Sequence, residues 1–155
     1  MTSKSEQIID FIATGFYSGR SKYMPGTCGS IVAFFLACCF SFFAINKLIV
    51  SILVILIGVL ICVLADRNSL YGNTKDPQQI VIDEFAGYFI TIVFFEWNLF
   101  NLFIALVFFR FFDITKPTPI KSFESIPGGY GIIIDDLIAG LYAAIFLFIL
   151  NYLIA

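Results

Sequence analysis

Carboxylates stand at the ends of long apolar stretches in this 155-residue chain. Asp83-Glu84 and Asp135-Asp136 lie beside two such stretches, and Asp113 follows another. A charged side chain at the centre of a membrane helix costs roughly 2.5–3.5 kcal/mol on insertion scales, so ionisable groups in or beside the bilayer mark functional sites by default. The spacing therefore indicates a cluster of charged groups at a membrane surface.

The two acidic pairs occur in similar segments. Asp83 and Gly87, like Asp136 and Gly140, stand four residues apart. On a helix, each glycine lies one turn beyond the carboxylate on the same face and lets another helix approach closely. Acids near helix N-termini are also favoured by the dipole, which is the purely structural alternative. Hard oxygen ligands in a chain without histidine suit Mg²⁺ or Mn²⁺ better than zinc, and we expect ligands among Asp83, Glu84, Asp113, Asp135 and Asp136.

Cationic side chains could hold a phosphate beside those acids. Arg110, Asp113 and Lys116 recur every third residue and share a broad helix face until Pro117 stops the helix. Arg110 could bind a phosphate through two hydrogen bonds, and Lys116 could add a point charge. A solvated ladder of ion pairs would use the same residues.

The segment Pro25-Gly26-Thr27-Cys28-Gly29-Ser30 carries two hydroxyl groups and leads into the first long apolar run. Backbone N–H groups and the hydroxyls of Thr27 and Ser30 could bind a phosphate at the positive end of a helix dipole. The alternative is a turn in which Ser30 is the N-cap. Near the other end of the chain, Gly128-Gly129-Tyr130-Gly131 predicts a flexible lead into the last helix.

Composition places these groups in a membrane protein. Hydrophobic residues make up 60% of the chain and charged residues 13%, with a mean hydropathy of +0.97. Soluble domains are roughly 45–50% apolar. We expect a single domain over residues 1–155, an all-α integral membrane bundle. Its predicted membrane-associated helices are Ile31–Ile45, Leu48–Ala65, Ile80–Phe95, Leu99–Phe112 and Leu137–Ile154.

The N-terminal segment predicts an amphipathic helix that does not span the membrane. Ile8, Ile9, Ile12 and Phe16 recur at helical spacing among polar residues. Such a helix either lies in the membrane interface or packs on the bundle. Trp97, between polar neighbours, is expected to anchor the protein at the interface.

Charge predicts the orientation of the bundle. If the breaks at Asn46-Lys47 and Glu96-Trp97-Asn98 are hairpin tips on one side, eight of the nine basic residues fall on the other. The positive-inside rule makes that side cytoplasmic. A net charge of −2 without a basic stripe argues against nucleic acid. The four cysteines show no C-x-x-C spacing, which argues against a zinc site or a disulfide framework.

Over about residues 10–145 the chain resembles the phosphatidylglycerophosphatase A family of bacterial membrane lipid phosphatases. The matching stretches are Pro25-Gly26-Thr27-x-Gly29-Ser30, Asp76-Pro77-x-x-Ile80-Val81-x-Asp83-Glu84-x-x-Gly87, Phe109-Arg110-x-Phe112-Asp113-x-x-Lys116-Pro117-x-Pro119-Ile120 and Gly128-Gly129-x-Gly131-Ile132-x-x-Asp135-Asp136-x-x-Ala139-Gly140. Each stretch alone is modest, but four in order on a chain of this size are highly specific.

The resemblance implies a Mg²⁺-dependent hydrolase of the bacterial inner membrane that converts phosphatidylglycerophosphate to phosphatidylglycerol. The residues agree with that chemistry. The chain has no histidine, so a histidine nucleophile is excluded. Cys62 and Arg67 are separated by only four residues, so the chain has no Cys-x5-Arg loop with a cysteine nucleophile. Metal-assisted attack by water or by a carboxylate remains.

Two other functions compete with this interpretation. A CDP-alcohol phosphotransferase would also use membrane carboxylates and Mg²⁺, but its Asp-Gly-x-x-Ala-Arg signature is missing from the sequence. A non-enzymatic, ion-coupled membrane protein would normally carry its acids near the middle of the membrane. Here the acids are expected at one boundary, which suits a lipid headgroup.

Overall fold

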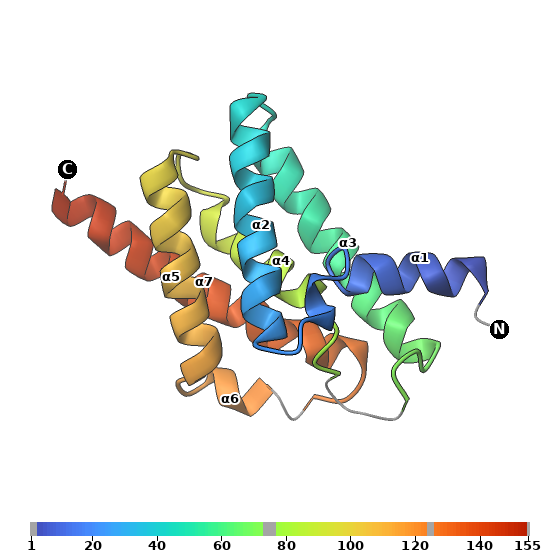
Figure 1. Cartoon of the computed structure of the whole chain (residues 1–155). Coiled ribbons are helices and arrows are strands. Elements are labelled where there is room, and N and C mark those ends of the chain that lie inside the picture. The colour runs from blue at the N-terminus through green and yellow to red at the C-terminus, as the bar shows by residue number, and fades with distance from the viewer. Residues whose placement is uncertain (1–2, 73–76, 124–125, 155) are drawn as a thin grey trace.

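All regular elements among the described residues, 3–72, 77–123 and 126–154 of a computed structural model, are helical (Figure 1). This confirms the predicted all-α class. In chain order the elements are α1 (Lys4–Ala13), the short 3-10 helix η1 (Ser18–Arg20), α2 (Pro25–Phe42), α3 (Lys47–Arg67), α4 (Ile82–Ile92), α5 (Leu99–Thr115), α6 (Ile120–Phe123) and α7 (Gly129–Ile154).

The outside of the bundle suits a bilayer. Within the described residues, α2, α3 and α7 are long and apolar enough to cross a membrane. Large apolar side chains cover their outer surfaces; on α3, for example, Leu53, Leu56 and Leu60 are each more than half exposed. Soluble proteins rarely expose contiguous apolar surface on this scale. The five predicted apolar helices correspond to α2, α3, α4, α5 and α7.

Two asparagines begin the helices that follow the hairpin tips. The side chain of Asn46 accepts hydrogen bonds from the backbone N–H groups of Leu48 and Ile49, and that of Asn98 accepts one from Asn101. Such caps satisfy N–H groups that have no partner within the helix. The two tips lie at one end of the bundle, and the first turns of α2 and α7 and the last turn of α5 lie towards the other (Figure 1).

The short helix α4 lies inside the bundle. Nine of its residues are buried, among them Phe85, Tyr88 and Phe89. The hydroxyl of Tyr88 donates a hydrogen bond of 2.9 Å to the backbone carbonyl of Leu102, which satisfies its polar atom in the core. Asp83 and Glu84 stand in the first turn of this central helix. They are therefore surrounded by other helices and not by lipid.

Helices α4 and α7 cross at two glycines. A Cβ atom on Gly87 would lie 2.7 Å from the carbonyl oxygen of Asp136, and one on Gly140 would collide with the carbonyl oxygen of Gly87. The hydroxyl of Thr91 lies in the same crossing and reaches the carbonyl oxygens of Gly87 and Gly140, at 2.8 and 3.2 Å. The predicted close approach of another helix at both glycines is confirmed.

The N-terminal helix is shorter than predicted. It ends at Ala13, and Phe16 lies beyond it in the left-handed backbone region, so the apolar stripe does not continue to Phe16 on one helix. Ile9 and Ile12 pack against the core, whereas Ile8 is 60% exposed. Helix α1 thus packs on the bundle and still presents apolar surface outward.

Three local interpretations were wrong. Trp97 is buried and donates a hydrogen bond from Nε1 to the carbonyl oxygen of Ile92, so it fills the core and is not an interfacial anchor. Ser30 is not an N-cap, because α2 already begins at Pro25, with Met24 at the cap position. The glycines Gly129 and Gly131 likewise belong to the first turn of α7 and do not form a flexible lead before it.

Candidate active site

The sequence motifs meet around one cavity of about 490 Å³. It lies where the first turns of α2 and α4 and the first two turns of α7 approach the end of α5. Its walls are both charged and apolar. The lining residues are Met24, Pro25, Gly26, Thr27, Gln78, Ile80, Asp83, Glu84, Arg110, Asp113, Ile114, Lys116, Ile132, Asp135 and Asp136.

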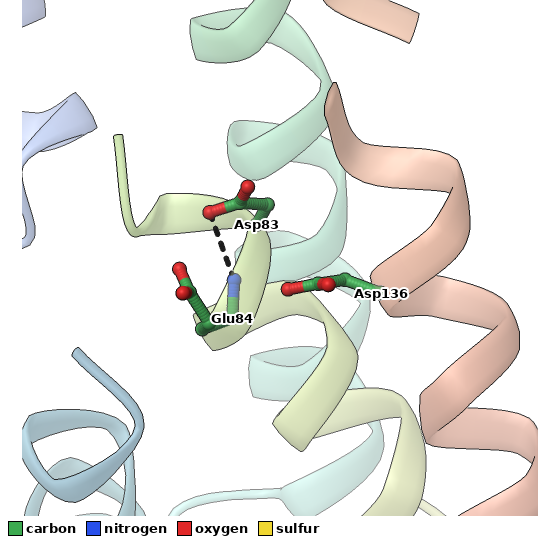
Figure 2. Close-up of side chains that lie close together, drawn as sticks. All are labelled: Asp83, Glu84 and Asp136. Atoms are coloured by element: carbon green, nitrogen blue, oxygen red, sulfur yellow. Dashed lines mark hydrogen bonds between the residues drawn. The ribbon is translucent and has the colours of Figure 1, made fainter. Parts of the chain in front are cut away.

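Three carboxylates from two helices lie close together in the site. Each of Asp83, Glu84 and Asp136 offers an oxygen, and these oxygens all lie within 4.8 Å of one another (Figure 2). Asp83 and Asp136 are buried, and the side chain of Glu84 is 12% exposed. Asp83 also accepts a hydrogen bond of 3.1 Å from the backbone N–H of Glu84. We call these three residues the carboxylate trio.

The trio lacks partners for some of its oxygens. Among the described residues, the buried atoms Glu84 Oε2 and Asp136 Oδ2 have no hydrogen-bond partner. Unpaired buried carboxylate oxygens are costly unless they are protonated or bind a cation. Mg²⁺ binds carboxylate oxygens and retains several waters, so the donor set and the cavity beside it fit that ion.

Burial also raises the pKa values of Asp83 and Glu84, the two trio members on the short helix α4. Burial raises the pKa of Asp83 well above its usual range, and the charges of Glu84 and Asp136 raise it further. Burial likewise raises the pKa of Glu84, to about 7, although a hydrogen bond with Asp83 and the charge of Arg110 act in the opposite direction. These carboxylates repel one another unless a proton or a cation intervenes.

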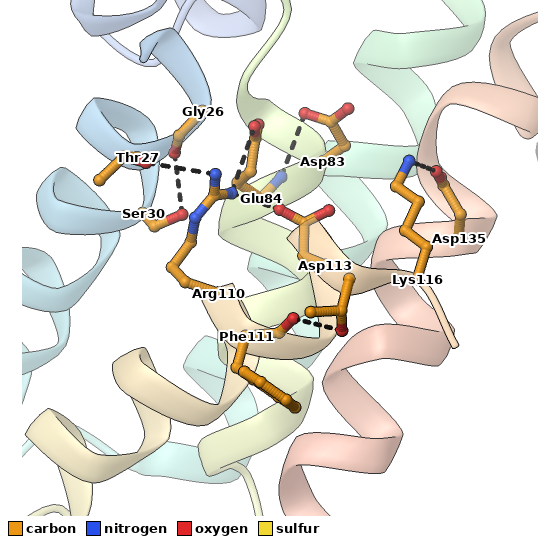
Figure 3. Close-up of polar contacts among 11 residues, drawn as sticks. Gly26, Thr27, Ser30, Asp83, Glu84, Arg110, Phe111, Asp113, Lys116 and Asp135 are labelled. Atoms are coloured by element: carbon orange, nitrogen blue, oxygen red, sulfur yellow. Dashed lines mark hydrogen bonds and ion pairs between the residues drawn. The ribbon is translucent and has the colours of Figure 1, made fainter. Parts of the chain in front are cut away.

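Arg110 connects three elements at the side of the trio (Figure 3). It forms an ion pair with Asp113, one helical turn along α5. Its Nη1 atom also lies 3.8 Å from Glu84 Oε1, and its Nη2 donates a hydrogen bond of 3.3 Å to Thr27 Oγ1. The guanidinium therefore lies between the first turn of α2 and the trio, where it could hold an anion.

Lys116 makes the second cation pair. It follows α5 as a C-cap in the left-handed region, and its Nζ lies 2.7 Å from Asp135 Oδ2. The five predicted metal ligands thus fall into two groups. Asp83, Glu84 and Asp136 lie together; Asp113 adjoins Asp136 and pairs with Arg110, and Asp135 pairs with Lys116.

The two predicted hydroxyl contacts are placed differently. Thr27 lines the cavity and accepts the hydrogen bond from Arg110. Ser30 is fully buried, does not line the cavity, and donates a hydrogen bond of 2.9 Å to the carbonyl oxygen of Gly26 (Figure 3). Gly26 itself allows close packing, because a Cβ atom there would collide with the carboxylate of Glu84.

Several lining residues were absent from the sequence-based candidates. Gln78, Ile80 and Ile132 all lie inside matched stretches but carry no obvious chemistry. Met24 directly precedes the Pro25-Gly26-Thr27 stretch and Ile114 directly follows Asp113, and that proximity is the signal that could have identified them. The motif residue Asp76 and the basic residue Lys75 lie outside the described residues.

Comparisons with known proteins agree on one family. The family model described as Phosphatidylglycerophosphatase A matches residues 11–151. A Haemophilus influenzae protein named Phosphatidylglycerophosphatase A is 37% identical over 152 residues, covering 93% of this chain and 89% of the relative. An Escherichia coli protein of the same name is 37% identical over 145 residues, covering 91% of this chain and 82% of the relative.

A third relative carries a different name. It is a Bacteroides thetaiotaomicron protein provisionally named phosphatidylinositol-3-phosphatase, 31% identical over 150 residues, covering 92% of this chain and 93% of the relative. No solved structure matches the chain significantly.

Proposed function

The chain belongs to the phosphatidylglycerophosphatase A family, and on that basis we propose that it hydrolyses phosphatidylglycerophosphate to phosphatidylglycerol and inorganic phosphate, with Mg²⁺ as cofactor. It is a membrane lipid phosphatase. The observation that carries the fuller proposal is the buried carboxylate trio beside Arg110 and Lys116 in one cavity. The non-enzymatic alternative is set aside because the family is enzymatic.

The trio would hold the metal ion. Asp83, Glu84 and Asp136 converge from α4 and α7, and two of their buried oxygens have no hydrogen-bond partner among the described residues. When bound, Mg²⁺ would supply a Lewis acid that polarises the phosphoryl group and lowers the pKa of a coordinated water. Asp113 and Asp135 border the same cavity and would orient the cations that they contact.

Arg110 and Lys116 would bind the terminal phosphate. Charge builds on the phosphoryl oxygens during transfer, and fixed donors aimed at those oxygens lower the barrier. Arg110 offers a planar fork with several N–H donors, and Lys116 adds a compact charge. Thr27 would help to orient Arg110, because its Oγ1 accepts a hydrogen bond from Nη2. In the net reaction a water oxygen forms a new P–O bond, the ester P–O bond breaks, and a proton from that water goes to the departing glycerol oxygen.

The site would face the cytoplasm. The predicted cytoplasmic side receives eight of the nine basic residues of the sequence, and Lys47 alone falls at the opposite tip. In that orientation a lipid made on the inner leaflet of the bacterial cytoplasmic membrane reaches the cavity without crossing the bilayer.

One assay tests the function directly. The detergent-solubilised protein is mixed with phosphatidylglycerophosphate, and phosphate release is measured with Mg²⁺ and with a chelator. We expect release that requires Mg²⁺. Phosphatidylinositol 3-phosphate is included because the Bacteroides relative bears that name. Faster turnover of that lipid would mean that phosphatidylinositol 3-phosphate, and not phosphatidylglycerophosphate, is the preferred substrate. Transfer of a phosphatidyl group to an alcohol without phosphate release would indicate a phosphotransferase.

A further inference from the structure

We propose that the lipid substrate enters the cavity sideways from the bilayer, between the start of α2 and the end of α5, with its glycerol backbone and first acyl carbons against Met24 and Ile114. This inference rests on the proposed function. It assigns a contact for the apolar part of the substrate, whereas the trio, Arg110 and Lys116 concern only the phosphate.

The cavity wall is unusual at these two positions. Met24 and Ile114 line the same cavity as the five carboxylates, yet their side chains are 64% and 62% exposed. The other large aliphatic residues in the lining, Ile80 and Ile132, are buried. Among the described lining residues, large exposed apolar surface therefore occurs only where α2 begins and α5 ends.

The apolar surface at Ile114 continues along α5. Phe103, Val107, Phe111 and Ile114 are each about half exposed or more, and their spacing of four, four and three residues places them along one side of the helix. This stripe begins near the hairpin tip at Asn98 and ends in the cavity wall. A lipid lying along it would carry its headgroup to the end of the helix, where Arg110 and Lys116 stand.

The backbone at Met24 supports a role for its side chain. Met24 has φ 50° and ψ 57°, in the left-handed region. Residues with a Cβ atom are disfavoured there by roughly 1–2 kcal/mol, and glycine or asparagine fits that conformation better. Nothing in the described structure buries the methionine side chain in return. Of the six non-glycine residues with positive φ among the described residues, Met24 and Lys116 are the two that line the cavity.

The two walls together match an amphipathic substrate. A phosphomonoester fits the charged end of the cavity, and the glycerol ester region fits the exposed apolar side. A soluble phosphate ester would lack the second contact. Met24 and Ile114 are therefore expected to favour lipid phosphates over soluble ones and to affect binding more than the chemical step.

The test is a double variant, Met24→Asn with Ile114→Asn. Asparagine tolerates the left-handed backbone at residue 24, so the change removes apolar surface without adding strain. The matched control is Leu53→Asn with Leu56→Asn, two exposed positions on α3 that do not line the cavity. Hydrolysis of dioleoyl phosphatidylglycerophosphate in mixed micelles gives kcat and KM, and inhibition by inorganic phosphate reports the charged end alone.

We expect kcat/KM of the double variant to fall about tenfold, or about 1.4 kcal/mol, mainly through KM. The inhibition constant for phosphate and the Mg²⁺ requirement should match those of wild type. The conservative pair Met24→Leu with Ile114→Leu, which keeps the apolar surface, should lose less activity than the asparagine pair. Should the double variant fail to fold, the single variants Met24→Asn and Ile114→Asn give the same comparison with smaller effects.

Two results would overturn the proposed entrance. One is a kcat/KM equal to that of the α3 control, and the other is a parallel loss of phosphate inhibition, which would mean that the variant had damaged the charged end. Failure of the proposed function looks different, because wild type itself would then release no phosphate from the lipid.

Discussion

A methyl group on Gly87 would lie 2.7 Å from the backbone carbonyl oxygen of Asp136, which is closer than Cβ atoms approach in real structures. Helices α4 and α7 are therefore in backbone contact at the level of the carboxylate trio. Asp83 lies one turn before Gly87, and Asp136 lies one turn before Gly140. The glycine crossing is what brings carboxylates distant in sequence to within 4.8 Å.

Adding a methyl group at this helix crossing should move the carboxylates of the trio apart. Gly87→Ala adds a methyl group that would collide with the Phe109 ring of α5 and with the Asp136 carbonyl oxygen of α7, and overpacking of this kind costs about 1–3 kcal/mol. We expect a lower unfolding temperature and weaker metal binding in the same variant. Thermal unfolding in detergent and Mn²⁺ titration measure the two effects. The control is Leu141→Ala, next to Gly140 but on the exposed side of α7; equal behaviour of the two variants would contradict the crossing's role.

The trio should determine metal affinity. Glu84→Gln and Asp136→Asn keep the side-chain shape and remove a charge, so each should raise the Mg²⁺ needed for activity and lower turnover by orders of magnitude. Mn²⁺ binding, measured by calorimetry, follows the same site without relying on turnover. Glu96→Gln serves as the control, because Glu96 pairs with Lys47 at the opposite tip. Unchanged Mn²⁺ affinity in both trio variants would exclude this metal site.

Asp113 and Asp135 should behave differently from the trio. Their carboxylates contact Arg110 and Lys116, so Asp113→Asn and Asp135→Asn should mainly weaken inhibition by inorganic phosphate through misplaced cations. We expect their Mn²⁺ affinities to stay nearer to wild type than those of Glu84→Gln. Calorimetry on the four variants tests the division, which fails if Asp113→Asn loses as much metal affinity as Glu84→Gln.

Arg110→Lys should keep the charge and lose much of the activity. A lysine cannot reach Asp113, Glu84 and Thr27 at once with a planar fork. The loss of one charged hydrogen bond costs roughly 1.5–3 kcal/mol, or about 10- to 150-fold in kcat/KM. Steady-state kinetics measure the effect, with exposed Arg67→Lys at the end of α3 as the control. Wild-type kinetics in Arg110→Lys would make Arg110 a structural ion-pair partner.

The charge of the cavity predicts an order of binding. Five carboxylates and two cations line it, a formal charge of −3 when all are ionised. A phosphate dianion is repelled from such a site until a divalent cation reduces the negative charge. Inorganic phosphate or vanadate should therefore bind only in the presence of Mg²⁺. Calorimetric titration with and without the metal checks this, and equal affinity under the two conditions would contradict it.

The orientation can be measured in cells. In a variant without native cysteines, Ser122→Cys reports the end with the site and Asn98→Cys reports the opposite tip. We expect a membrane-impermeant thiol reagent to label Asn98→Cys from outside and Ser122→Cys only after permeabilisation. The reverse pattern would place the site on the outer face, away from a lipid made on the inner leaflet.

Much of this protein was determined by local sequence. Apolar runs of helical length predicted the bundle, because a bilayer admits chain segments whose backbone hydrogen bonds are satisfied internally. The four-residue spacing of Asp83 with Gly87 and of Asp136 with Gly140 predicted the close helix approach, because helical periodicity alone puts both residues on one face.

Only the tertiary structure separated the charged residues by position. Sequence spacing could not separate Asp136 from its neighbour Asp135, yet adjacent helical residues point about 100° apart, so one joins Asp83 and Glu84 and the other meets Lys116. Trp97 was misjudged for a similar reason, because its burial depends on contacts outside its own segment. The lining role of Met24 and Ile114 likewise arises only where the start of α2 and the end of α5 come together.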